Sequence, residues 1–172
     1  MELLGKRIAI LAEDDYQEME LWYPLYRMRE AGAETIVVGM PGVESYHSKH
    51  GYPVHVDAAA DAVAAESFDA VIIPGGYAPD RMRRHRAMLD LVSRVFEKKG
   101  VVAFICHAGW VPISADIVKG KQVTSVSAIK DDLINAGATW IDREVVQDGN
   151  LISSRGPSDL PAFCRVIIAA LQ

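Results

Sequence analysis

The sequence contains few cysteines, no excess of positive charge and no long apolar run. Its two cysteines, Cys106 and Cys164, lie far apart and provide no disulfide framework, which suits a reducing cytoplasm. A net charge of −5 without a basic stripe argues against nucleic acid as the main partner. No apolar run approaches the ~20 residues of a membrane span, so we expect no membrane association. Residues 1–12 show no signal-peptide cleavage pattern and are expected to hold the first strand.

The chain does contain enough apolar residues for one core. Half of its 172 residues are hydrophobic, which predicts a single folded domain over residues 1–172. No metal-ligand spacing occurs, and we expect neither a metal nor another cofactor. His47, His50 and His55 fall in a segment that we expect to be a solvated loop.

Apolar segments alternate with amphipathic ones along the chain. We predict strands over residues 7–12, 35–39, 70–73, 101–105 and 122–126, and a hairpin of residues 144–147 and 151–154. We predict helices over residues 16–31, 86–99, 129–136 and from about 157 to the end, with Ser158 or Asp159 capping the last one. Residues 41–57 are expected to be irregular or hairpin-like. The alternation predicts an α/β fold with a mostly parallel sheet.

Cys106 follows the apolar run Val101–Ile105 directly and precedes His107 and a helical stretch. A buried, inert cysteine is the commoner situation, and we expect it for Cys164. On a sharp strand-to-helix turn, however, a side chain is exposed at the end of the sheet, and the next backbone N–H can face an oxyanion. The following helix directs its positive end at the sulfur, which favours the thiolate. The pattern therefore predicts a cysteine nucleophile with a lowered pKa.

Two other segments are expected at the same sheet edge, because ligands bind at the carboxyl ends of parallel strands. Glu18 and Glu20 open the first helix, and one of them could reach Cys106; simple compensation of the helix dipole is the alternative. Gly75 and Gly76 follow the third strand and could aim N–H groups at a ligand; an ordinary turn is the alternative. With the amides after Cys106, they could form an oxyanion hole.

A series of motifs, in order over nearly the whole chain, points to a known family. The motifs are Glu18-x-Glu20-Leu21, Tyr23-Pro24, Pro74-Gly75-Gly76-x-Ala78-Pro79-Asp80-Arg81, Ile105-Cys106-His107, Ile129-Lys130-Asp131-Asp132, Asn135-Ala136-Gly137 and Asp148-Gly149-Asn150. They resemble those of the DJ-1/PfpI superfamily, and of the PfpI-type intracellular cysteine peptidase branch in particular. The resemblance implies a flavodoxin-like three-layer sandwich with a nucleophile elbow. It also implies a homo-oligomer, either a dimer or a hexamer.

The resemblance further implies roles for individual residues. Cys106 matches the nucleophile, with His107 as its neighbour. Glu20 matches the carboxylate that hydrogen-bonds the sulfur, and Gly76 matches part of the oxyanion hole. Asp80 matches the acidic position that reaches the histidine of a neighbouring subunit to complete a triad. Activities in the superfamily include peptidase, glyoxalase and deglycase reactions, and other members are redox sensors or chaperones.

The sequence departs from the family pattern at four places. Ala108-Gly109-Trp110 stands where the family has Gly, Pro and a polar residue, and we expect Trp110 to wall or fill the pocket. Asp80 is one methylene shorter than the usual Glu. Gln17 and Val126 stand where the branch has a carboxylate and a tyrosine. These departures bear on a peptidase activity and leave the nucleophile intact.

The leading hypothesis is a cytoplasmic enzyme whose Cys106 attacks a carbonyl carbon. Its substrates would be peptides and small amides, or 2-oxoaldehydes and their adducts. Amides near Gly75, Gly76 and Ala108 would hold the oxyanion. The alternative is a non-enzymatic stress sensor that oxidises Cys106 to the sulfinic acid, hydrogen-bonded to Glu20. A glutaminase-like module is a weaker third hypothesis.

Overall fold

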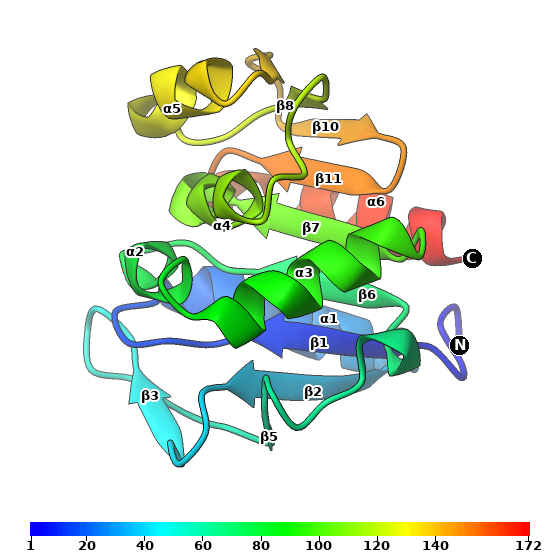
Figure 1. Ribbon diagram of the computed structural model, residues 1–172. Coiled ribbons are helices and arrows are strands. Elements are labelled where there is room, and N and C mark those ends of the chain that lie inside the picture. The colour runs from blue at the N-terminus through cyan, green and yellow to red at the C-terminus, as the bar shows by residue number, and fades with distance from the viewer.

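A seven-stranded sheet lies between two layers of helices in the computed structural model, which describes residues 1–172 (Figure 1). The strands, in chain order, are β1 (Arg7–Leu11), β2 (Glu34–Gly39), β5 (Ala58–Ala59), β6 (Ala70–Ile73), β7 (Val101–Ile105), β10 (Val145–Asp148) and β11 (Leu151–Ser154). Their order across the sheet is β10-β11-β7-β6-β1-β2-β5. Every neighbouring pair is parallel except β10 and β11, which form the predicted hairpin.

Helices cover both faces of this sheet, which confirms the predicted three-layer α/β architecture. Figure 1 shows α1 (Glu18–Glu30) and α6 (Leu160–Leu171) behind the sheet, and α2 (Ala78–Met82), α3 (Arg86–Glu97) and α4 (Trp110–Ser114) in front of it. The other elements are the hairpin β3 (Ser45–His47) and β4 (Pro53–His55), the pair β8 (Gln122–Val123) and β9 (Thr139–Trp140), helix α5 (Lys130–Asn135), and the 3₁₀ turns η1 (Ala65–Ser67), η2 (Cys106–Gly109), η3 (Ser127–Ile129) and η4 (Pro157–Asp159). None of the helices combines the length and apolarity that crossing a bilayer requires.

The central strands β6 and β7 are buried along their whole length. Strands covered on both faces have no solvent side, so they consist of continuous apolar runs rather than alternating ones. The largest side chains in the core include Phe68, Phe104 and Phe163, which are all fully buried. One cluster of 51 buried residues packs both faces of the sheet against their helices. This packing supports the ends of the central strands.

The structure differs from the predicted elements at two places. The strand predicted over residues 122–126 stops at Val123, because the buried Thr124 amide bonds to the Ser153 hydroxyl (2.9 Å) instead of a neighbouring strand. Asp159 stands at the N-cap position of α6, as predicted, but its side chain forms no capping hydrogen bond. The Asp159 carboxylate turns back to Arg155 instead, accepting from its Nε (2.9 Å) and Nη2 (3.0 Å).

Asn150, at the hairpin between β10 and β11, provides a test of this packing. Its side-chain amide donates to the carbonyl oxygens of Phe96 (2.9 Å) and Gly100 (2.8 Å), which ties the end of α3 to the hairpin. Because Asn150→Ala leaves both carbonyls without this donor, we expect it to lower the free energy of unfolding by about 1–3 kcal/mol in urea denaturation. Asn135→Ala, at an exposed position in α5, should change it by less than about 0.5 kcal/mol. Equal changes in the free energy of unfolding for the two substitutions would contradict a stabilising role of these hydrogen bonds.

Candidate active site

Cys106 lies on a sharp turn between β7 and the 3₁₀ turn η2. Its backbone has a φ of 62°, in the left-handed region that costs a non-glycine residue about 1–2 kcal/mol. The side chain is half-buried, so the sulfur is neither enclosed in the core nor fully solvated. The structure therefore contains the strand-to-helix elbow that the sequence predicts.

The loops that follow β1 and β6 are hydrogen-bonded together beside this elbow. The Gln17 amide donates to the Gly75 carbonyl (3.2 Å), and the Tyr77 amide donates to the Asp15 carbonyl (2.9 Å). Gly76 lies between them with a φ of 76°, and a Cβ atom there would lie 2.5 Å from the Asp15 oxygen and the Gln17 nitrogen. Only glycine fits this crossing, so Gly76 fixes how closely the two loops approach.

Glu20 is the carboxyl group beside the thiol, and its side chain is completely buried. Its Oε2 atom accepts a hydrogen bond from the Gly75 amide (2.8 Å), whereas Oε1 has no oxygen or nitrogen partner. A Cβ atom on Gly75 would lie 2.5 Å from Glu20 Oε2 and 2.8 Å from the Cys106 Cβ. The missing side chain of Gly75 thus allows the carboxyl and the thiol to lie side by side.

Burial raises the pKa of both acids, and an ionised Glu20 raises that of Cys106 further. Burial raises the pKa of Glu20 to about 7, against hydrogen bonds from Gly75 and Cys106 that lower it. Burial and the charge of an ionised Glu20 raise the pKa of Cys106 to about 12, against amide hydrogen bonds that lower it. This corrects the predicted lowering of the thiol pKa, because burial disfavours the thiolate and an ionised Glu20 repels it. A proton on Glu20 removes that repulsion.

His107 lies directly beside the sulfur, with its Nδ1 atom 3.4 Å from Cys106 Sγ. Burial, followed by the charge of Lys49, lowers the pKa of His107, so the ring is neutral at pH 7 and one nitrogen can accept a proton. The backbone amides of Gly76 and His107 face the sulfur and act to lower the pKa of the thiol, against the larger effect of burial. Gly75 and Ala108, which the sequence suggested as further donors, do not line the pocket, and the Gly75 amide is already bonded to Glu20.

A small pocket opens at the sulfur, with a volume of about 150 Å³. Its walls are Gln17, Glu20, Lys49, Gly76, Tyr77, Cys106, His107 and Pro157. A protein cavity of about this size holds a molecule such as benzene, so the pocket fits a few heavy atoms rather than a length of peptide. Sequence reasoning missed Lys49, Tyr77 and Pro157, because they lie in loops whose course no periodic pattern reveals.

Two residues expected at the site lie outside this pocket. Trp110 does not wall it; the indole Nε1 donates to Asp132 (2.8 Å), and the ring lies against the His107 ring at 5.4 Å between centroids. Asp80 is exposed on α2 and forms no ion pair within the chain. Trp110 therefore supports His107 from behind, while Asp80 faces solvent.

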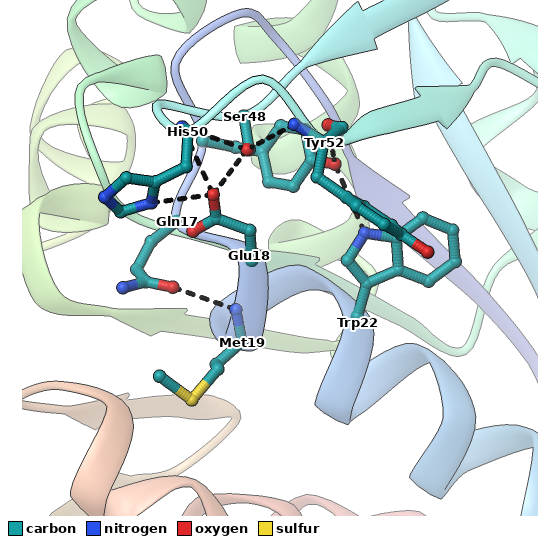
Figure 2. Close-up of polar contacts among 8 residues, drawn as sticks. Gln17, Glu18, Met19, Trp22, Ser48, His50 and Tyr52 are labelled. Atoms are coloured by element: carbon teal, nitrogen blue, oxygen red, sulfur yellow. Dashed lines mark hydrogen bonds and ion pairs between the residues drawn. The ribbon is translucent and has the colours of Figure 1, made fainter.

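Glu18 turns away from Cys106 toward the β3–β4 hairpin (Figure 2). Its Oε1 atom accepts from the Ser48 hydroxyl, from the His50 amide (3.2 Å) and from His50 Nδ1 (2.8 Å). Burial alone would raise the pKa of Glu18, but these hydrogen bonds outweigh it and hold the pKa below its ordinary value. The solvated loop expected for His50 is thus an anchored turn, although the imidazole itself is mostly exposed.

Comparison with known proteins gives this geometry a context. The chain is 42% identical over 167 residues to "Deglycase PfpI" of Pyrococcus furiosus, covering 96% of this chain and 99% of that one. The crystal structure of Drosophila melanogaster DJ-1beta superposes with a TM-score of 0.91 at 30% identity, covering 98% of this chain and 91% of that chain.

A second solved structure shares the same flavodoxin-like fold. It is a two-domain protein of Anabaena variabilis, with DJ-1/ThiJ/PfpI-like and ferritin-like domains, which matches at a TM-score of 0.95 and 40% identity. The match covers 97% of this chain, which spans 48% of that longer protein. The sequence profile described as DJ-1/PfpI family matches residues 6–170. With nearly the whole chain matched in sequence and in structure, this protein belongs to the DJ-1/PfpI family.

Proposed function

We propose that this protein is an enzyme that uses Cys106 to attack the carbonyl carbon of small substrates. The observation that carries the proposal is the thiol on its elbow, opening into a pocket and lying against a buried carboxyl. Residues 6–170 match a family in which 42% identical relatives are named deglycases. Both the local chemistry and this kinship favour a reaction at a carbonyl group.

The proposed reaction begins with transfer of the thiol proton to the neutral His107 ring. The thiolate attacks the carbonyl carbon, and the oxygen takes the negative charge within reach of the Gly76 and His107 amides. A protonated Glu20 can direct its free Oε1 hydroxyl at the sulfur, which gives that buried oxygen the partner it otherwise lacks. Thus Glu20 would hold the thiolate in place without adding a second charge.

The size of the pocket favours small carbonyl compounds over peptides. A volume of about 150 Å³ accommodates a 2-oxoaldehyde such as methylglyoxal or the carbonyl end of an adduct. We therefore place glyoxalase- or deglycase-type conversion ahead of peptide hydrolysis. Gln17, in place of the branch carboxylate, points the same way, because its side chain accepts a bond from the Met19 amide (2.8 Å) and supplies no acid or base.

We further propose that the protein acts in the cytoplasm as a homo-oligomer. Three large side chains on α1, Met19, Tyr23 and Tyr26, are 56%, 42% and 59% exposed, and such apolar area on a surface favours association. The free carboxylate of Asp80 is available to a neighbouring subunit. We include in this proposal that Asp80 reaches the histidine of a neighbouring subunit and completes a triad there.

Cys106→Ser should abolish turnover of methylglyoxal. Removing an acting nucleophile typically costs a factor of roughly 10³ or more in kcat, whereas a bystander thiol costs little. Activity is followed as loss of the 2-oxoaldehyde, with peptide substrates assayed in parallel. Cys164→Ala is the control, because Cys164 is buried in α6 away from the pocket and its loss should leave kcat intact. Substantial activity in the Cys106 variant would overturn the proposal.

Glu20→Gln should change how stability depends on pH. Folding raises the pKa of Glu20 from its ordinary 4.5 to about 7, so the native protein keeps a proton that the unfolded chain releases. The stabilisation is complete below pH 4.5 and is lost as the pH rises through about 7. Relative to the variant, the wild type should lose about 3 kcal/mol of unfolding free energy between about pH 4 and pH 8.

Urea denaturation at several pH values measures this difference. Glu44→Gln is the control, because Glu44 is exposed and its variant should follow the wild type. Parallel pH profiles for the wild type and Glu20→Gln would show that the native carboxyl holds no extra proton.

The second candidate function is a redox sensor. It is favoured by the unpartnered Oε1 of Glu20, which can hydrogen-bond an oxygen on an oxidised Cys106 as well as the sulfur itself. Mild peroxide followed by mass measurement should then add two oxygens to Cys106 and none to the buried Cys164. Selective oxidation without any turnover of methylglyoxal or peptides would favour the sensor, whereas turnover without selective oxidation would exclude it.

A further inference from the structure

Lys49 is the only lysine or arginine in the wall of the Cys106 pocket. It is exposed, and no carboxylate of the chain forms a salt bridge with its ammonium group. The active-site mechanism proposed above assigns it no part. A cation at the mouth of a reactive pocket, free of any partner in the protein, is available to a ligand.

Hydrogen bonds hold the two residues that flank Lys49, Ser48 and His50, against Glu18 (Figure 2). Both residues donate to the Glu18 carboxylate, so the turn is bonded on either side of Lys49. The Lys49 amide itself donates to the Tyr16 carbonyl (3.1 Å). The Ser48 hydroxyl also accepts from the Tyr52 amide (2.9 Å) and the His50 amide (3.2 Å). The first turn of α1 thereby fixes where the lysine stem begins.

The positive charge of Lys49 matters because the pocket wall holds little other charge. The one acidic residue of the wall is Glu20, and burial raises the pKa of that carboxyl to about 7. Lys49 lies close enough for its charge to act after burial as a second cause that lowers the pKa of His107. Near neutral pH the pocket wall therefore carries a full positive charge on Lys49 and only a partly ionised carboxyl on Glu20, although the whole chain carries a net charge of −5.

We propose that Lys49, held in place by Glu18 through Ser48 and His50, selects small carbonyl substrates that carry a carboxylate close to the reacting carbon. The inference rests on the proposed function and narrows its substrate class. The ammonium group would bind the carboxylate at the mouth while the carbonyl carbon lies at the sulfur. A neutral carbonyl compound of the same size would enter the pocket without this attraction.

Two thiol reagents of nearly equal size test the proposal without any turnover. Iodoacetate carries the carboxylate and iodoacetamide does not, and both replace iodide at one carbon by the Cys106 sulfur. The ratio of their rate constants at Cys106, measured by peptide mass spectrometry at pH 7, cancels the fraction of thiolate. Lys49→Met should lower the ratio of iodoacetate to iodoacetamide about fivefold, and Lys49→Arg should largely preserve it.

Lys98→Met is the matched control, because Lys98 lies at the other end of the sheet, just before β7 begins. It should leave the ratio at the wild-type value. The wild-type preference should also shrink in high salt, since a partly exposed charge is screened. A ratio that Lys49→Met leaves unchanged would overturn the selection of anions.

Ser48→Ala tests whether the network positions the lysine. The substitution removes a bond to Glu18 without changing any charge, so the ratio should fall toward that of Lys49→Met while thermal unfolding still shows a folded protein. An unchanged ratio would show that Lys49 needs no such support. Because alkylation needs only an accessible thiol, an altered ratio together with absent turnover would reject the proposed function and keep the anion site.

Discussion

The contact between the Glu20 carboxyl and the Cys106 sulfur governs the architecture of this site. Glu20 is fully buried and Cys106 is half-buried, and the charge of an ionised Glu20 disfavours a second negative charge on the sulfur. Several features around them serve this contact. Gly75 lacks the side chain that would separate them, and its amide holds one carboxyl oxygen. The left-handed backbone at Cys106 directs the sulfur out of the strand toward Glu20.

The two glutamates in the first turn of α1 contact different parts of the structure. Residues two positions apart on a helix point in nearly opposite directions, so Glu18 and Glu20 cannot serve the same neighbour. Glu20 points inward to the thiol and is buried, whereas Glu18 points to the hairpin and binds Ser48 and His50. One helical turn therefore connects Cys106 with the loop that carries Lys49. The same short segment thus positions the carboxyl beside the sulfur, through Glu20, and the cation at the pocket mouth, through Glu18.

The family kinship gives the fold, while the arrangement at the pocket depends on this chain's own residues. Trp110 shows the distinction well. Its indole packs on His107 and donates to Asp132 rather than closing the pocket. Trp110 thus supports the histidine and leaves the opening free.

The apolar runs of β6 and β7, the glycines after β6 and the Cys106 junction were all evident from the sequence by itself, because continuous burial and left-handed turns restrict the residue types that fit. It therefore determined the parallel sheet and the elbow, and it singled out Cys106 as the candidate nucleophile. Only the tertiary structure decided which of two glutamates meets the thiol, which amides face the sulfur, and that Lys49 completes the pocket wall. Those outcomes depend on loops that the fold brings together across the sheet. The pKa of Cys106 depends on burial, which raises it although the sequence predicts a lowered value. The local periodicity of the sequence carries no information about how loops meet or how deeply a side chain is buried.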